Sequence, residues 1–285
     1  MKKLRYLFEY LFMKNIIWLC SLPNKRNRMR LGSLLGRFVF ALGIRKKTVV
    51  QNLEIAFPKL DNAERIKIAK NCYSHFGKVI VDTFNVTKWN DAEFKDRVKL
   101  LGLEHLDKAL LRGKGVIIAT AHFGCFDVIT PRLCIDGYKN ITIYQRIHNP
   151  YVDEYIMKIR TMKGAQVAKR GIQIRLILKA LKKNECVGFL ADQDAGGSGL
   201  FIPFFSKTAS TFRGLAELAI RTRAPIVPAF TPVIDGVYNA IFEEEIQIGS
   251  VEEIMTEYNR RVENIVKKFP EQYFWLHKKW KSVKK

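Results

Sequence analysis

The feature that most constrains the fold is an alternation of short apolar runs with longer amphipathic segments, which begins after Leu100. The short runs are rich in β-branched and aromatic residues: VIIATA (116–121), ITIY (141–144), AQVA (165–168), CVGFLA (186–191), PIVPAF (225–230) and YNAIF (238–242). Such runs, separated by helical segments, are typical of parallel strands joined by helices. We therefore predict an α/β fold with a largely parallel central sheet flanked by helices.

The region before this alternation has the pattern of helices. NLEIAFP ends at Pro58, Asp61 is suited to capping a following helix, and apolar residues then recur every three or four positions up to Phe84. We expect this region to be a scaffold. A chain of 285 residues with 48% apolar residues can bury a substantial core, as one large domain or as one domain with a helical annex.

The N-terminus is strongly basic. The first 50 residues hold 12 Lys or Arg against the single acid Glu9, in a chain of net charge +22. The basic stretch 24–30 precedes the apolar segment 31–44, which contains Arg37 and is shorter than the roughly 20 residues that span a bilayer. We predict that residues 1–45 form a helical segment lying on anionic lipid and that residues 46–285 form the main domain. A hairpin packed on that domain is the alternative.

Polar motifs follow two of the predicted strands at the point where each strand ends. AHFGCFD (121–127) follows VIIAT, and DQDAGGSG (192–199) follows CVGFLA. The carboxyl ends of parallel strands meet at one edge of a sheet, where ligands collect. We expect these two motifs to lie at the same edge.

The spacing of His122 and Asp127 points to general-base catalysis. In a continuous helix, residues five apart differ by about 140° in direction, so the two side chains could not share a face. If the strand turns into a helix at Gly124, the Asp127 carboxylate can reach one imidazole nitrogen and leave the other free to deprotonate a hydroxyl. The alternative is a buried histidine held by a capping aspartate.

Metal binding and cysteine chemistry are both disfavoured. As a calcium loop DQDAGGSG fails, because its fifth position is Gly196 and its twelfth is Pro203 instead of Glu. Asp192 and Asp194 could still hold the ion of a metal-dependent glycosyltransferase, which is an alternative enzyme class. The five cysteines are odd in number and lack CxxC spacing, as expected for free thiols in a reducing compartment. We do not expect Cys125 to be a nucleophile, and we predict no metal site.

Six segments, in this order, carry a resemblance to a known family: NLEIAFP (52–58), AHFGCFD (121–127), YQRIHNPYVDEYIMKIR with KGAQV (144–167), VGFLADQD (187–194), GLFIPFFSKTASTFRGLAELAIRTRAPIVPAF (199–230) and PEQYFWLHKKWK (270–281). The chain resembles the lipid A biosynthesis lauroyl/myristoyl acyltransferases. They are a branch of the HxxxxD/E acyltransferases, which also include the glycerol-phosphate acyltransferases. The resemblance implies a glycerol-phosphate-acyltransferase-like fold, with residues 46–285 as the catalytic domain.

The resemblance also implies an activity. The chain is expected to transfer a fatty acyl group from acyl carrier protein to a hydroxyl of a phosphorylated glucosamine-based lipid A precursor, at the cytoplasmic face of the inner membrane. His122 would be the general base and Asp127 its orienting carboxylate, with no cofactor beyond the carrier thioester as co-substrate. Relatives usually have Glu where this chain has Asp127, so a lysophospholipid or another glycolipid remains an alternative acceptor.

Further residues are candidates for binding the acceptor. Arg146 and Arg160 suit its phosphate, since a guanidinium binds phosphate in a bidentate way. The resemblance implies that Asp192 and Gln193 organise the acceptor or their loop, and that FIPFF (201–205) lines an acyl site. The C-terminal YFWLHKKWKSVKK would suit a membrane surface or, in a non-enzymatic adaptor, nucleic acid. It has no RNA-binding signature. We therefore predict acyl carrier protein, anionic lipid and the glycolipid as partners, and no nucleic acid.

Overall fold

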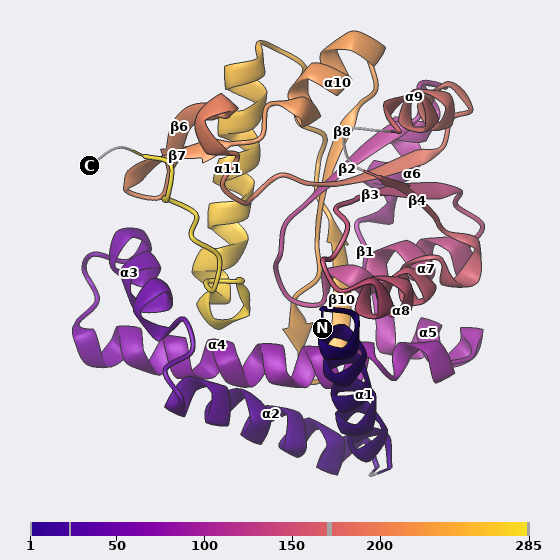
Figure 1. The fold of residues 1–285 in the computed structure, drawn as a ribbon. Helices are drawn as coiled ribbons and strands as arrows, with labels where there is room; N and C mark the ends of the chain where they lie inside the picture. The colour runs from indigo at the N-terminus through magenta and orange to yellow at the C-terminus, as the bar shows by residue number, and fades with distance from the viewer. Residues whose placement is uncertain (1, 23, 170–172, 284–285) are drawn as a thin grey trace.

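A computed structural model describes residues 2–22, 24–169 and 173–283, with an eight-stranded sheet at the centre (Figure 1). The strand order is β1-β10-β8-β2-β5-β3-β4, and the short β9 pairs with β10. The strands are β1 (Val98–Leu101), β2 (Val116–Thr120), β3 (Asn140–Tyr144), β4 (Gln166–Lys169), β5 (Cys186–Leu190), β8 (Ile226–Phe230), β9 (Val233–Ile234) and β10 (Val237–Phe242). Each apolar run singled out in the sequence therefore forms a strand, as predicted.

The sheet is largely parallel, which confirms the predicted fold class. Strands β8, β2, β5, β3 and β4 run parallel to one another, whereas β10 is antiparallel to β8 and parallel to β1. Strand β2 is buried along its whole length. Ile117 and Ala119 belong to one hydrophobic core, and Val116 and Ile118 to a second core on the other face. Burial on both faces explains why β2 reads as a continuous apolar run.

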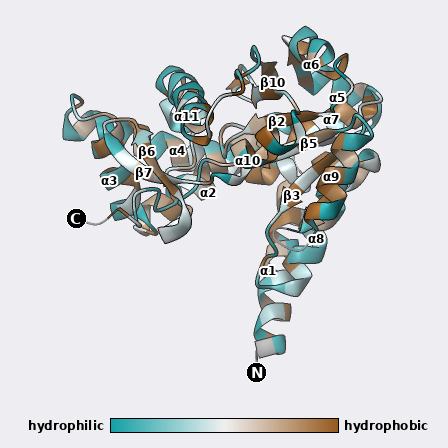
Figure 2. Cartoon of the chain, turned by 90° about the horizontal axis from the view of Figure 1, so that it is seen from above, coloured by the Kyte–Doolittle hydropathy of each residue, from teal (hydrophilic) through white to brown (hydrophobic). Residues whose placement is uncertain are grey.

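Helices cover both faces of the sheet (Figures 1 and 2). The core that contains Val116 is closed by α5 (Asp91–Arg97), α6 (Leu103–Leu110) and α7 (Ile129–Ile135). The core that contains Ile117 is closed by α9 (Ile174–Lys182), α10 (Gly214–Thr222) and α11 (Val251–Lys268). A separate antiparallel hairpin of β6 (Leu200–Phe204) and β7 (Lys207–Thr211) packs on α11.

The predicted scaffold consists of α3 (Lys46–Ala56) and α4 (Asn62–Thr83). Asp61 caps α4 in a reciprocal arrangement with Glu64. The Glu64 N–H donates to Asp61 Oδ1 at 2.8 Å, and the Asp61 N–H donates to Glu64 Oε2 at 2.9 Å. These bonds satisfy donors that the first helical turn cannot pair internally, so they fix where α4 begins. The predicted cap at Asp61 is confirmed.

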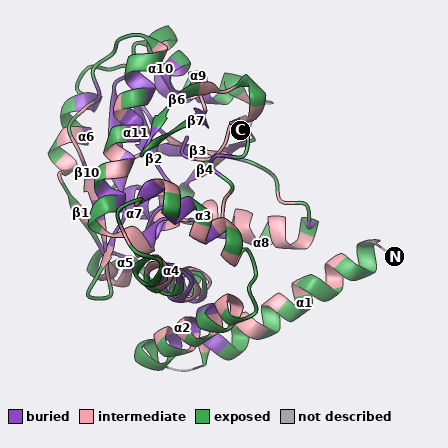
Figure 3. Ribbon diagram, turned by 90° about the vertical axis from the view of Figure 1, so that its left-hand side faces the viewer, coloured by how far each residue is buried: buried purple, intermediate pink, exposed green. Residues whose placement is uncertain are grey.

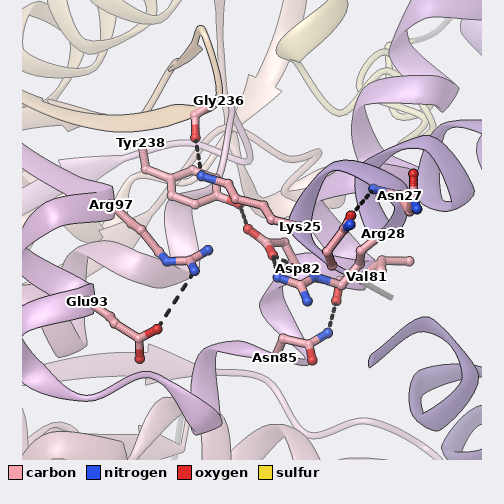
Figure 4. A network of polar contacts seen from close by, with 11 residues as sticks. Lys25, Asn27, Arg28, Val81, Asp82, Asn85, Glu93, Arg97, Gly236 and Tyr238 are labelled. Atoms are coloured by element: carbon pink, nitrogen blue, oxygen red, sulfur yellow. Dashed lines mark hydrogen bonds and ion pairs between the residues drawn. The ribbon is translucent and has the colours of Figure 1, made fainter. Parts of the chain in front are cut away.

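One face of α2 (Lys25–Ala41) is packed tightly on α4. A Cβ atom on Gly36 would lie only 1.9 Å from the carbonyl oxygen of Tyr73, so the close approach of the two helices requires glycine there. At the other end of the contact the buried Arg28 donates to Asp82 at 3.3 Å, and the hydroxyl of Tyr238 also donates to Asp82 (Figure 4). This face of α2 matches the alternative of a packed hairpin.

The outer face of α2 and most of α1 (Lys2–Ser21) are exposed. Leu34 and Phe38 on α2 are each 61% exposed, and Phe8 on α1 is 71% exposed. Figure 3 shows α1 extending away from the sheet, beside α2 and α8 (Pro150–Arg160). Among the residues that the structure describes, no helix combines the length and apolar character needed to cross a bilayer. Met1 and Pro23 of the predicted segment 1–45 lie outside the described residues, and membrane contact of this segment stays a prediction.

Candidate active site

The site is built where β2 and β5 end side by side. These strands pair in parallel with Thr120 opposite Leu190, so residues two positions further along each chain also face each other. His122 Nδ1 lies 2.8 Å from Asp192 Oδ1, and the backbone N–H of His122 donates to Asp192 Oδ2 at 3.1 Å. The prediction that the two polar motifs lie at one edge of the sheet is confirmed.

The loop that carries His122 is fixed on two sides. Gly124 has a φ of +58°, and a Cβ atom there would lie 1.7 Å from the carbonyl oxygen of Thr231. The Gly124 N–H donates to the carbonyl of Gln272 at 2.8 Å. The Phe274 N–H donates to the carbonyl of His122 at 3.0 Å. Glycine therefore permits the predicted tight turn, and the C-terminal segment holds the turn in place.

Asp127 does not occupy its predicted place beside the imidazole. It lies in the short 3₁₀ turn Phe126–Val128 and accepts a hydrogen bond from Arg160 Nε at 3.1 Å on its Oδ1. Arg160 Nη2 forms an ion pair with the same oxygen at 3.1 Å. The predicted hydrogen bond between Asp127 and His122 is therefore wrong in this structure. The strand register brings Asp192 to the imidazole nitrogen instead, while Asp127 meets the last residue of α8.

The electrostatics favour a paired imidazole and carboxylate. Burial by itself lowers the pKa of His122, but the charge and hydrogen bond of Asp192, with a smaller contribution from the charge of Asp127, raise the net pKa above its usual value. Burial alone would raise the pKa of Asp192. The charge and hydrogen bonds of His122, with the charge of Lys279, lower it overall. Asp192 is thus ionised at neutral pH, and it holds the Nδ1–H tautomer of His122.

Behind Asp192 lies a buried lysine that the sequence did not single out as a site residue. Lys279 is 2% exposed, and its Nζ donates to the carbonyls of Ser210 at 3.2 Å and Gln193 at 3.4 Å. Burial lowers the pKa of Lys279 to about 8, although Asp192 and Asp194 oppose the shift. A charged lysine beside a buried carboxylate offsets part of the cost of removing both from water.

His122 faces a cavity of about 610 Å³ that is lined by both apolar and polar residues. The apolar residues come from strand ends and loops: Ile143, Ile147, Phe189, Leu190 and Phe212. The polar residues include His122, Arg160, Gln193, His277 and Lys281. Of the predicted acceptor-binding residues, Arg160 and Gln193 line the cavity, and Asp192 supports it from behind. Arg146 does not line it, since its side chain is 67% exposed and its Nε lies 3.6 Å from Asp153 Oδ2.

The C-terminal segment contributes two residues that sequence reasoning missed, Phe274 and His277. The ring centroid of Phe274 lies 6.4 Å from that of His122, and His277 lines the cavity. Asn52 of the NLEIAFP motif holds this segment, because its Nδ2 donates to the carbonyls of Trp275 and His277 at 2.7 Å each. Both motifs were visible in the sequence, but the spacing between them could not show that they meet.

A second, apolar cavity of about 330 Å³ lies between α1, α2 and α4. Phe274 and Leu276 also line it, so the residue that packs near His122 belongs to this cavity as well. Residues 201–205, which the resemblance associates with an acyl site, line neither this cavity nor the one that His122 faces. Ile202 and Phe204 are instead buried in the core.

The cysteines have the state expected from the sequence. All five are free, and Cys125 is 1% exposed despite its place in the motif. Burial raises the pKa of the Cys125 thiol, and the charges of Asp127 and Asp82 raise it further. A buried neutral thiol is a poor nucleophile, which agrees with the prediction that Cys125 does not form an acyl intermediate.

Comparison with known proteins matches residues 1–282 to the family described as bacterial lipid A biosynthesis acyltransferase. The chain is similar to the lipid A biosynthesis lauroyltransferase of Escherichia coli, at 27% identity over 89% of this chain and 85% of the relative. It is also similar to a lipid A biosynthesis acyltransferase of Haemophilus influenzae, at 26% identity over 88% and 80%. The palmitoleoyltransferase of Escherichia coli is 27% identical over 88% and 84%.

Proposed function

The chain belongs to the bacterial lipid A biosynthesis acyltransferase family, and from this premise we propose that it moves a fatty acyl chain from an acyl carrier protein thioester to a hydroxyl of a phosphorylated glucosamine-based lipid A precursor. The observation that carries the proposal is the hydrogen bond of 2.8 Å between His122 Nδ1 and Asp192, beside a cavity that is lined by both polar and apolar residues. A paired imidazole with a free second nitrogen is the arrangement that activates a hydroxyl nucleophile.

The proposed mechanism needs no acyl-enzyme. Nε2 of His122 accepts the proton of the acceptor hydroxyl while its oxygen attacks the thioester carbonyl carbon. The new C–O bond forms, the C–S bond of the tetrahedral intermediate breaks, and the imidazolium returns the proton to the carrier thiolate. Asp192 stabilises the imidazolium during this transfer without accepting the proton. Its burial and its two hydrogen bonds to His122 support this role.

The surroundings of His122 support the substrate class. Arg160 supplies a cation at the cavity for the phosphate of the acceptor, and its stacking over Tyr144 at 5.0 Å fixes the guanidinium plane. We propose that Gln193 contacts the same acceptor. The apolar cavity beside Phe274 suits a hydrocarbon chain, since its lining is almost entirely aliphatic or aromatic. Asp127 enters the mechanism through the hydrogen bond that it accepts from Arg160 and through its charge near His122.

We further propose that residues 1–45 hold the protein on anionic lipid at the cytoplasmic face of the inner membrane, while residues 46–285 carry the catalytic domain. Exposed apolar side chains of α1 and α2 occur in a stretch of high positive charge. Each Lys or Arg near an anionic surface contributes about 1 kcal/mol of attraction, and shallow apolar insertion adds a part that salt does not screen.

Mass spectrometry of reaction products tests the proposed activity. Purified protein is incubated with carrier thioesters of several chain lengths and with a lipid A precursor, a lysophospholipid or a neutral glycolipid. We expect acylation of the lipid A precursor, also in the presence of excess EDTA. Acylation of the lysophospholipid alone would replace the acceptor. Loss of activity with EDTA and its recovery with manganese would favour a metal-dependent transferase instead.

Liposome flotation tests the membrane proposal. The double variant Phe8→Ser with Phe38→Ser removes exposed apolar side chains without touching the packed face of α2. We expect this variant to float less with anionic liposomes, above all at high salt, where the apolar contribution remains. The matched control is Leu111→Ser, which removes a side chain that is 88% exposed outside the N-terminal helices. Equal flotation of all three proteins would contradict the proposal.

A further inference from the structure

The cavity that His122 faces contains a second histidine, to which the mechanism above assigns no role. His277 lines the same cavity as His122 and Gln193. Its backbone is fixed, because the His277 N–H donates to the carbonyl of Phe274 at 3.3 Å and its own carbonyl accepts from Asn52 at 2.7 Å. The ring is therefore presented to the cavity from a rigid segment, and not from a mobile terminus.

The two nitrogens of the His277 ring have different surroundings. Nδ1 is buried and has no hydrogen-bond partner among the described residues, whereas Nε2 is not among the buried unpartnered atoms of the described chain. Burial lowers the pKa of His277. The charges of His122 and Lys279 lower it further, and those of Asp192 and Asp194 oppose the shift. The ring is thus neutral at neutral pH and carries one proton.

The position of this proton follows from the cost of each tautomer. A proton on Nδ1 would be a buried N–H without an acceptor among the described residues, which is unfavourable because the desolvation of the donor is not compensated. A proton on Nε2 avoids this cost, because Nε2 is not a buried unpartnered atom and the residue lines the cavity. A neutral donor also suits a site that contains a general base, because a second cation at this place would lower the pKa of His122 and make it a weaker base.

We propose that His277 stabilises the oxyanion of the tetrahedral intermediate by donating a hydrogen bond from Nε2–H. This inference rests on the proposed acyl transfer. When the acceptor oxygen adds to the thioester carbonyl, the carbonyl π electrons move to its oxygen, and His277 holds that charge until the C=O bond forms again. The proton of His277 stays on Nε2 throughout, so the proton balance between acceptor, His122 and carrier thiolate is unchanged.

The test compares His277→Ala with His277→Gln, because the amide nitrogen of Gln can replace the Nε2–H donor without a titratable ring. Both are assayed with the carrier thioester and lipid A precursor. For His277→Ala we expect kcat to fall by about 10²- to 10³-fold with little change in KM, as for the loss of one oxyanion donor. We expect the kcat of His277→Gln to be at least about tenfold higher than that of His277→Ala, since Gln restores a hydrogen-bond donor. The matched control His105→Ala removes a half-buried histidine of α6 that does not line the cavity, and it should keep wild-type kinetics.

The outcomes separate this inference from the proposed function. Wild-type protein that acylates no acceptor would overturn the proposed function. An active wild type with an equally active His277→Ala variant would overturn only the role of His277. The same follows if His277→Gln is as slow as His277→Ala, or if the loss falls entirely on KM, since either result indicates a structural or substrate-holding role. Thermal unfolding of each variant shows whether it is folded before its kinetics are compared.

Discussion

The loop after β2 and the loop after β5 each bring a carboxylate towards His122, but they hold it in different ways. Asp192, after β5, is 2% exposed and is hydrogen-bonded to both the ring and the backbone of His122. Asp127, after β2, is partly exposed and is bound to Arg160. The acid that is close to His122 in sequence is thus paired elsewhere, and the acid 70 positions away is its hydrogen-bond partner.

The sheet explains this difference. Parallel strands in register keep a constant offset, and Thr120 opposite Leu190 extends directly to His122 opposite Asp192. Asp127 comes after the chain has turned at Gly124, so it lies nearer to α8 than to the imidazole nitrogen. Strand pairing therefore decides which residues lie next to each other at a sheet edge, more than their separation in the sequence does.

Replacing His122 should have the largest effect. We expect His122→Ala to abolish acyl transfer while the protein remains folded, because no other described side chain is paired with Asp192 as a base. Product formation is measured by mass spectrometry, and folding by circular dichroism and thermal unfolding. Wild-type turnover by folded His122→Ala protein would refute the general-base mechanism.

Replacing Asp192 tests the role of the buried carboxylate that is hydrogen-bonded to His122. Asp192→Asn keeps the shape but removes the charge that fixes the tautomer, so we expect a loss of roughly 10²- to 10⁴-fold in kcat. The pH profile should change as well. The base works only when His122 is neutral, so activity falls as the pH drops through its raised pKa. Without Asp192, burial remains and lowers this pKa, which moves the acid limb of kcat/KM to lower pH. An unchanged acid limb would contradict the pairing.

The fold was largely predictable because its signals are local. A buried parallel strand such as β2 is apolar at all positions but its last, and the start of α4 is marked by a capping aspartate with Glu three positions later. The packing of α2 was harder to predict from the sequence. Its basic and apolar composition suggests a lipid surface, whereas Gly32, Gly36 and Gly77 permit a close helix contact that composition does not reveal.

The site was predictable only in part. His122, Arg160, Asp192 and Gln193 were identified, but their pairing was not, because strand order cannot be read from a single sequence. Asp192 was predicted to organise the acceptor or the loop, and its contact with His122 depends on β5 lying beside β2. His277 and Lys279 were visible in YFWLHKKWK, yet alternating aromatic and basic residues suggest a surface, and nothing local indicates that Lys279 is buried.

Variants of Asp127 and Arg160 test the role of the partly exposed carboxylate and of the arginine that binds it. We expect Asp127→Asn to lower kcat/KM for the acceptor by about 10- to 100-fold, the worth of a hydrogen bond to a charged group. Arg160→Lys should cost a similar factor, and the double variant little more than either single one, since both remove the same pair. Additive losses would show that Asp127 acts independently of Arg160, for instance directly on His122.

The smallest expected effect concerns Lys279, the cation behind Asp192, and it is measured as stability against pH. Lys279 has a pKa of about 8 in the folded protein, below its value in an unfolded chain. Above pH 8 the folded state has released this proton while the unfolded state still binds it, so the unfolding free energy rises with pH in this window. We therefore expect wild-type protein to gain about 1–2 kcal/mol relative to Lys279→Met between pH 7.5 and 9.5, in chemical denaturation. Lys281→Met, at an exposed position, should follow the wild-type slope. Parallel curves for wild type and Lys279→Met would mean that Lys279 remains charged throughout this range, with Asp192 compensating for its burial more strongly than the geometry suggests.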